Sequence, residues 1–161
     1  MKKKSLFSSI ILIGFGLYFY LDHLPFAWLR ELYHWPTLFM IIGLAFLAQG
    51  YLAKDHEAIL PGTILFGFGL HFHVVQKYDI WPDHIGIFLL IIGLGFLLRY
   101  QKTGAGLLQG FLFLVLSTLL LFYDNIIEWL GLLELNALST LNLWPLLFIL
   151  IGLYLFIARK K

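Results

Sequence analysis

The sequence has no cysteine and few charged residues. Without cysteine the chain can form no disulfide, no thiolate metal site and no cysteine nucleophile. Charged residues make up 12% of its 161 residues and hydrophobic residues 61%, whereas a soluble domain carries about 25% charged residues. The chain therefore lacks the polar side chains needed to cover a water-exposed surface. We expect most of it to lie in lipid.

The motifs of enzyme and cofactor sites are also missing. His56-Glu57 begins like the helix of a zinc protease, but Leu60 stands where the second histidine would be. The sequence has no G-x-S-x-G turn for a serine nucleophile. Its net charge of +2 is too small to indicate a nucleic-acid partner. We therefore expect a protein that is not an enzyme and that has no cofactor.

A Trp-Pro pair occurs three times, each time before an uncharged apolar run with a central glycine. The three segments are 35–47, 81–97 and 144–156. The spacing from Trp to Gly is eight residues in the first and third copies and twelve in the second. Proline suits the first turn of a helix, and tryptophan suits the membrane interface. The pairs predict helix starts and interface anchors at Trp35, Pro36, Trp81, Pro82, Trp144 and Pro145. A ligand or partner site formed by the three tryptophans is the alternative.

The apolar run before each Trp-Pro pair repeats as well. Residues 10–20 and 63–73 match position by position, with Gly14 and Gly16 on Gly67 and Gly69. In the third copy, aligning Asp124 with Asp22 puts Leu116 and Thr118 at the places of the two glycines. The repeating unit is a helical hairpin of about fifty residues. The hairpins are 1–53 (helices about 5–21 and 36–53), 54–103 (about 60–75 and 82–100) and 104–161 (about 104–123 and 145–159).

The positions of the charges predict the topology. The basic N-terminus and the first apolar run resemble a signal peptide, but no small-x-small cleavage site follows, so we expect an uncleaved first helix. If six helices cross the membrane with both termini in the cytoplasm, nine basic residues lie inside and two outside. This predicts an all-α membrane protein with six transmembrane helices in three parallel hairpin repeats. The inner residues are Lys2, Lys3, Lys4, Lys54, Arg99, Lys102, Arg159, Lys160 and Lys161, and the outer ones are Arg30 and Lys77.

Two histidines and a set of glycines are the remaining candidate residues. His71 and His73 are weak candidates for a metal or proton-sensing site, because they are polar side chains within an apolar run. Residues two apart on a helix point about 200° apart and cannot chelate one ion together. The glycines predict close helix packing in lipid, or alternatively the lining of a substrate path. They are Gly14, Gly16, Gly43, Gly67, Gly69, Gly93, Gly95, Gly106, Gly110 and Gly152.

The segments before the first and third Trp-Pro pairs, 24–34 and 124–142, are rich in Leu and Ile and hold one Trp each. Leu24, Trp28 and Leu29 share one helical face in the first segment. Such segments are typical of short amphipathic helices that lie in the interface plane. They are expected to cap the helices or to contact lipid, envelope precursors or a partner protein.

A glycine-centred helix, an outer segment and a Trp-Pro helix that ends around I-G-L resemble the LiaI/LiaF-like transmembrane region. The residues that carry the resemblance are 12–19 with 35–47, 65–72 with 81–97, and 144–156. The resemblance implies a bacterial plasma membrane protein linked to cell-envelope stress, with a partner such as a sensor kinase or an envelope protein. LiaF-type members carry a soluble domain after the helices and restrain a histidine kinase. That domain is expected to be absent here, so kinase inhibition is not implied.

The sequence as a whole predicts a non-enzymatic, multi-pass membrane protein that acts by contacts with lipid and with another membrane protein. Its expected role is an interaction or regulatory component of the envelope stress response or of envelope maintenance. The alternative is a small transporter or channel that uses the interface between the hairpins. Transport requires polar side chains facing a shared cavity, and the sequence has few of them.

Overall fold

The computed structural model describes most of the chain. The described residues are 4–21, 23, 25, 32–77, 82–129, 145, 149–150, 152–153 and 157. Trp81, Trp144, most of the segment 24–34 and all of 130–142 lie outside them. The chain forms two compact units, residues 1–118 and 119–161. Each unit is described by itself.

All regular secondary structure among the described residues is helical. The elements are α1 (Lys4–Leu21), α3 (Trp35–Leu52), the short 3₁₀ helix η1 (His56–Ala58), α4 (Ile59–Lys77), α5 (Ile85–Thr103), α6 (Leu107–Leu121) and α7 (Tyr123–Trp129). By length and composition, three helical segments among them can cross a membrane: Trp35–Leu52, His56–Lys77 and Ile85–Thr103. Leu6–Leu21 and Leu107–Leu121 are shorter apolar helices. The prediction of an all-helical membrane protein is confirmed.

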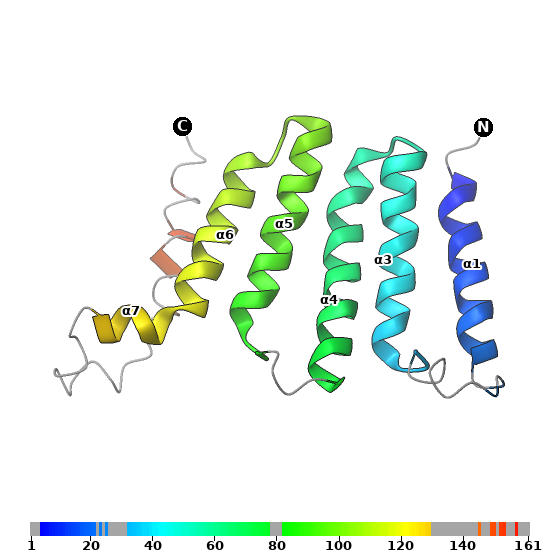
Figure 1. The fold of residues 1–161 in the computed structure, drawn as a ribbon. Coiled ribbons are helices and arrows are strands. Elements are labelled where there is room, and N and C mark those ends of the chain that lie inside the picture. Colours follow the sequence, from blue (N-terminus) through cyan, green and yellow to red (C-terminus); the bar gives the residue numbers. More distant parts are fainter. Residues whose placement is uncertain are drawn as a thin grey trace. The chain divides into compact units, whose positions relative to one another are not determined.

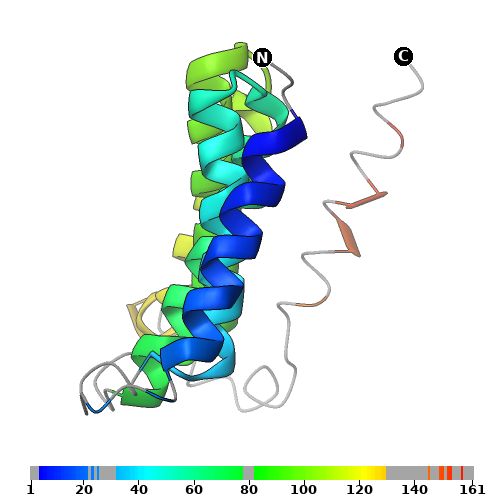
Figure 2. The same ribbon diagram turned by 90° about the vertical axis from the view of Figure 1, so that its right-hand side faces the viewer.

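Within residues 1–118 the helices lie in a row. α1 packs on α3, α3 on α4 and α4 on α5, and two views at right angles show them side by side (Figures 1 and 2). Successive helices run in opposite directions. We call the end at which α1 and α4 finish and α3 and α5 begin the Trp-Pro end, and the opposite end the Arg99 end. The row places the Trp-Pro helices α3 and α5 on either side of α4.

Helices α3 and α5 both follow a histidine N-cap, and the two histidines are fifty residues apart. His34 and His84 are the N-cap residues, and both have extended backbones (φ −129° and −130°). The Nδ1 atom of His84 accepts a hydrogen bond from the Gly86 N–H at 3.0 Å, which caps the first turn. Consequently α5 starts at Ile85, three residues after Pro82, whereas α3 starts at Trp35 itself. The second Trp-Pro pair therefore precedes its helix and does not open it.

Glycines bring the backbones of α3 and α4 together. A Cβ atom on Gly43 would meet the backbone of Phe66. A Cβ on Gly69 would lie 2.7 Å from the carbonyl oxygen of Pro36, and one on Gly62 would lie 2.8 Å from the nitrogen of Leu47. Small residues permit this approach in lipid, where dispersion contacts replace the hydrophobic effect between helices. Gly62 was not among the glycines singled out from the sequence.

Helix α5 packs on α6 through contacts of the same kind. A Cβ on Gly93 would lie 3.1 Å from the side chain of Leu114, and one on Gly110 would lie 2.9 Å from Leu97. The fully buried Ser117 hydroxyl donates a 2.7 Å hydrogen bond to the Gly86 carbonyl. The turn between the two helices begins at Gly104, whose φ of +70° is the left-handed conformation of a helix C-cap.

The connection between α3 and α4 contains a left-handed residue that is not glycine. Lys54 has φ +58°, and its side chain is exposed. This conformation costs an L-residue about 1–2 kcal/mol. Lys54→Gly should therefore raise the free energy of unfolding by about 0.5–1 kcal/mol, because the greater freedom of glycine in the unfolded chain offsets part of the gain. Unfolding of the two proteins in detergent titrated with sodium dodecyl sulfate would measure the difference. An equal or lower stability of the glycine variant would contradict it.

Candidate functional site

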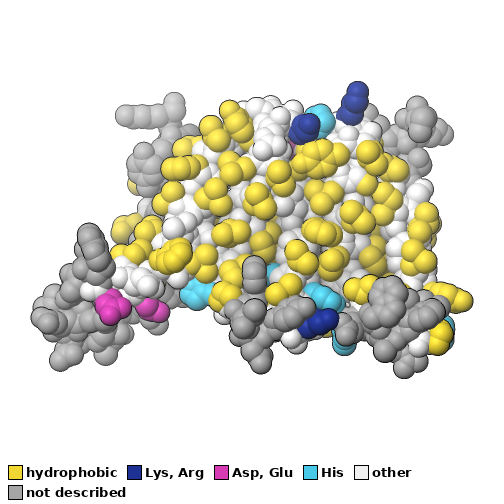
Figure 3. Space-filling model, viewed as in Figure 1, with side chains coloured by type: hydrophobic (Ala, Val, Ile, Leu, Met, Phe, Trp, Pro, Cys, Tyr) yellow, Lys and Arg dark blue, Asp and Glu magenta, His cyan; other side chains and the backbone are white. Residues whose placement is uncertain are grey.

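Polar side chains gather at the two ends of the helix row in residues 1–118. Apolar side chains cover the middle of the face formed by α3, α4 and α5, and histidine and charged side chains lie above and below them (Figure 3). This distribution is typical of helices that cross an apolar layer and meet water at both ends. The two ends differ in composition, and the Trp-Pro end holds most of the histidines.

His71 is the most deeply buried titratable side chain of the Trp-Pro end. It lies near the end of α4 with 2% of its surface exposed. Its ring packs edge-on against Phe88 of α5, with the centroids 4.9 Å apart. Its Nε2 atom lies 3.6 Å from Oδ1 of Asp83, whose side chain is 70% exposed. When the imidazole is protonated, this pair links α4 to the residues that lead into α5.

His73 lies in a different place. Together with His34, Gln76 and Lys77 it lines a cavity of about 260 Å³ between the start of α3 and the end of α4. All four side chains can donate a hydrogen bond, and Lys77 is positively charged. The residues from α4 stand at positions i, i+3 and i+4, which share one helical face. That spacing is present in the sequence, and it could have predicted that Gln76 and Lys77 lie on the same helix face as His73.

The first Trp-Pro pair lies beside this cavity. Pro36 is fully buried in the first turn of α3, and Trp35 is 49% exposed. The Trp35 ring packs against Phe72 of α4 with a centroid distance of 5.0 Å. Proline thus begins the helix, while the indole spans the joint between α3 and α4 and keeps an exposed edge for the interface.

A second cavity, of about 430 Å³, lies over α4 between α3 and α5. Its lining is almost wholly apolar and includes Leu47, Phe66, Leu94 and Leu98. Its polar side chains are few, and they include Thr63 and His71. The Thr63 hydroxyl donates to the Ile59 carbonyl of its own helix at 2.8 Å. The cavity suits an apolar chain and offers no continuous polar lining for an ion.

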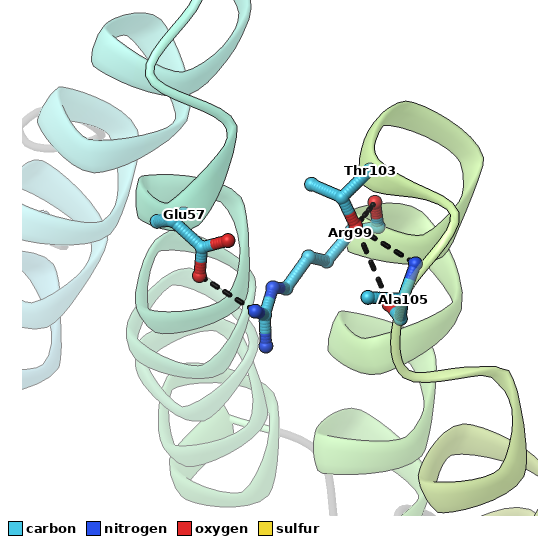
Figure 4. Close-up of polar contacts among 4 residues, drawn as sticks. All are labelled: Glu57, Arg99, Thr103 and Ala105. Atoms are coloured by element: carbon cyan, nitrogen blue, oxygen red, sulfur yellow. Dashed lines mark hydrogen bonds and ion pairs between the residues drawn. The ribbon is translucent and has the colours of Figure 1, made fainter.

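The Arg99 end is held together by an ion pair. The Arg99 guanidinium on α5 reaches Glu57 on η1, with 2.7 Å between Nη2 and Oε2 (Figure 4). The Thr103 hydroxyl donates to the Arg99 carbonyl at 3.0 Å and accepts from the Ala105 N–H at 3.1 Å. Because Glu57 is largely exposed, we expect the pair to fix the orientation of α5 more than to add stability.

The two candidate histidines do not form one site. His71 faces α5 and Asp83, whereas His73 faces the start of α3. Among the described residues, no group of three His, Cys, Asp or Glu side chains could hold a metal ion. The geometry instead gives the Trp-Pro end two separate polar features, a histidine–carboxylate contact and a basic cavity.

Comparison with known proteins fits this membrane architecture. Residues 6–47, which cover most of α1 and of α3, match the LiaI-LiaF-like transmembrane region. Over 165 residues the chain is 30% identical to the uncharacterised membrane protein YsxD of Bacillus subtilis (strain 168), with 100% of this chain and 98% of that protein covered. The chain belongs to the LiaI-LiaF-like family. No solved structure matches it.

The match to the LiaI-LiaF-like region covers most of the first predicted hairpin. It contains Gly14, Gly43 and the first Trp-Pro pair. In the structure, a Cβ on Gly14 would clash with the Ile41 side chain of α3. The resemblance seen in the sequence is therefore confirmed, and the residues that carry it include those at which α1 and α3 touch. The relationship identifies a membrane protein and leaves its partner open.

Proposed function

We propose that this protein is a non-enzymatic, multi-pass component of the bacterial plasma membrane that acts in the envelope stress response or in envelope maintenance by contacts with lipid and with another membrane protein. The observation that carries the proposal is the contrast between the apolar helix row and its Trp-Pro end. There the basic cavity, the His71–Asp83 contact and the half-exposed Trp35 lie at one end of the row. Family membership supports the envelope role.

The proposed topology has six spans, with both termini in the cytoplasm. Lys54, Arg99 and Lys102 lie at the Arg99 end, and the acidic Asp83 lies at the Trp-Pro end. A basic excess on one side is the signal that orients membrane helices, so it supports an inner Arg99 end and an outer Trp-Pro end. The polar cavity then faces the outside, where envelope components are found.

The proposed organisation is three parallel hairpin repeats. Its support is the recurrence of contacts: Gly14 meets Ile41 within the first hairpin, and Gly67 meets Ile91 within the second. The isoleucines are fifty residues apart, as are the N-cap histidines. Equivalent residues thus make equivalent contacts in the first two hairpins, as expected of a repeat architecture.

The alternative is a small transporter or channel between the hairpins. Within the part of the chain that the structure describes, the 430 Å³ cavity favours it, and its apolar lining restricts it to an apolar cargo. Reconstitution in liposomes tests this alternative: flux of a specific apolar solute would favour transport over the interaction role.

A complementation experiment tests the interaction role. A strain that lacks the protein should be more sensitive to compounds that damage the cell envelope, and the wild-type gene should restore growth. A variant with His73→Ala and Lys77→Ala should fail to restore it at equal protein level, because the cavity loses its basic side chains. The matched control is Leu90→Ala with Leu94→Ala, which alters the middle of α5. Full rescue by the cavity variant would contradict the proposal.

The partner can be sought directly. A photoreactive amino acid in place of Gln76, which is exposed beside the cavity, should crosslink a sensor kinase or an envelope protein in native membranes. The same residue in place of Gln101, an exposed position near the Arg99 end, should not give that product. Identical products from both positions would argue against a partner site at the Trp-Pro end.

A further inference from the structure

One pattern of residues recurs on the first helix of every hairpin. A small residue is followed four positions later by a larger apolar one and seven positions later by another small one. This spacing places all three side chains on one face of the helix. The triplets are Ser9, Ile13 and Gly16 on α1; Gly62, Phe66 and Gly69 on α4; and Gly110, Leu114 and Ser117 on α6.

The triplet on α4 receives the Trp-Pro helix of the preceding hairpin. Gly43 of α3 lies against the Phe66 backbone, between the two small residues of the triplet. A Cβ on Gly62 would lie 2.8 Å from Leu47, and one on Gly69 would lie 2.7 Å from Met40. The small residues thus let α3 lie directly on α4.

The triplet on α6 receives α5 through equivalent residues. A Cβ on Gly93 would lie 3.1 Å from Leu114, and one on Gly110 would lie 2.9 Å from Leu97. The Ser117 hydroxyl donates a 2.7 Å hydrogen bond to the Gly86 carbonyl. Gly93, Leu97 and Gly86 stand fifty positions after Gly43, Leu47 and Pro36. Equivalent residue pairs therefore join successive hairpins twice, with closer backbone contacts between α3 and α4 than between α5 and α6.

On α1, Ile13 and Gly16 of the triplet have no helix against them among the described residues. Ile13 is 63% exposed, and a Cβ on Gly16 would meet no atom within 4 Å. Phe19, which stands where Phe72 stands on α4, is 61% exposed. Its counterpart Phe72 packs on Trp35. Helix α1 thus has the acceptor pattern of α4 and α6, and no described helix covers Ile13, Gly16 or Phe19.

We propose that this face binds the third Trp-Pro segment, residues 144–157, of a second copy of the chain. Gly152 follows Trp144 by eight residues, as Gly43 follows Trp35. Ile149 and Leu153 flank it and are exposed, and a Cβ on Gly152 would meet no atom within 4 Å. The segment therefore has the donor pattern of α3, and α1 has the acceptor pattern of α4.

A second copy is the expected partner of the α1 face, because the interfaces of α3 with α4 and of α5 with α6 use the same pattern of residues. Lipid tails would cover an apolar face equally well without small residues at fixed spacing, whereas close helix contact requires them. Joining the first helix of one copy to the last segment of another is a head-to-tail contact, which builds rings or open rows of subunits. The inference rests on the proposed hairpin repeats and extends them across molecules.

Disulfide crosslinking in native membranes tests the proposal, because the chain has no cysteine of its own. One tagged chain carries Phe19→Cys, and a second, differently tagged chain carries Trp144→Cys. These positions correspond to Phe72 and Trp35, whose ring centroids are 5.0 Å apart inside the chain. Mild oxidation should give a dimer that carries both tags. Leu17→Cys, two positions away on another face of α1, is the matched control and should not crosslink to Trp144→Cys.

The outcomes separate this inference from the hairpin repeats on which it rests. Trp35→Cys with Phe72→Cys in one chain is the internal standard and should crosslink within the molecule. If it does while the mixed chains do not, the repeats stand and the second copy is excluded. If one chain with both Phe19→Cys and Trp144→Cys crosslinks only to itself, the segment occupies its own α1 and the proposal is wrong. Failure of the internal standard would contradict both.

A packing variant gives an independent measurement. Gly16→Leu should reduce the yield of the mixed dimer about tenfold, the effect of ~1.4 kcal/mol, because the leucine keeps the partner helix away. Leu17→Phe, also at an exposed site, should leave the yield unchanged. Equal yields for Gly16→Leu and the unmodified chain would overturn the proposed interface.

Discussion

Replacing Gly43 with alanine should lower the free energy of unfolding by about 2 kcal/mol, since overpacking of a tight contact costs about 1–3 kcal/mol. The new methyl group would meet the backbone of Phe66. A flexible side chain can turn away from such a contact, but a backbone can move only with its helix. Helices α3 and α4 would separate, and their other glycine contacts would be lost as well. Unfolding in detergent titrated with sodium dodecyl sulfate measures the change.

Gly16→Ala is the matched control for this substitution. Both glycines lie inside apolar helices, so the intrinsic gain in helix propensity is the same, up to about 1 kcal/mol. Gly16 has no atom within 4 Å of its Cβ position. The control should therefore be as stable as the wild type or slightly more stable when measured on the dilute monomer. Equal stabilities of the two variants would show that α3 and α4 do not approach as described.

Ser117→Val should have the second largest effect, a loss of about 1–3 kcal/mol of unfolding free energy. The hydroxyl is fully buried and forms the 2.7 Å hydrogen bond to the Gly86 carbonyl across the contact of α5 and α6. Valine removes the donor, leaves a buried carbonyl without this partner and adds volume at a site without room. The same detergent unfolding assay reports the loss.

Thr118→Val is the control for Ser117→Val. Thr118 is exposed, and its hydroxyl bonds the Leu114 carbonyl within its own helix at 2.9 Å. Its replacement by the isosteric valine in an apolar setting should change stability by less than about 0.5 kcal/mol. A larger loss of stability for Thr118→Val than for Ser117→Val would contradict the packing described, because it would mean that Thr118 and not Ser117 faces α5.

The apolar runs and glycines of the sequence predicted much of this fold. Runs of 15–20 uncharged residues predict membrane helices, because length and hydropathy are enough to identify a segment that can cross a bilayer. Glycines in such runs predict close packing, and Gly43, Gly69 and Gly93 lie at the contacts between helices. Gly62 also lies at a contact between helices, near the start of α4. It was not predicted, because the adjacent Pro61 and the preceding loop obscured where the helix begins.

Helix starts and register were harder to predict. The second Trp-Pro pair lies four residues further from its glycine than the first, and only the cap shows why: His84, not Pro82, ends the connection before α5. In the third copy the alignment on Asp124 put Thr118 at the place of the second glycine. The contacts instead put Ser117 there, because its hydroxyl meets the Gly86 carbonyl. The helix start and the register both depend on contacts between residues that are distant in the sequence, and local sequence patterns do not predict such contacts.

The candidate site was only partly predictable for the same reason. His71 and His73 could be named from the sequence, and their opposite directions on one helix follow from its geometry. Their neighbours could not be predicted, because Asp83 and His34 come from the segments before α5 and α3 and meet the two histidines only in the folded row. The order of the helices in the row, which decides those neighbours, is set by tertiary packing.

Cysteine labelling in intact cells tests most directly whether the helix row crosses the membrane with its Trp-Pro end outside. Single cysteines replace Asp79, Glu128 and Lys54 in the cysteine-free chain. A reagent that does not cross membranes should label the first two in intact cells and Lys54→Cys only after the cells are permeabilised, because Lys54 lies at the Arg99 end. Labelling of Lys54→Cys in intact cells, or protection of Asp79→Cys and Glu128→Cys, would contradict the account.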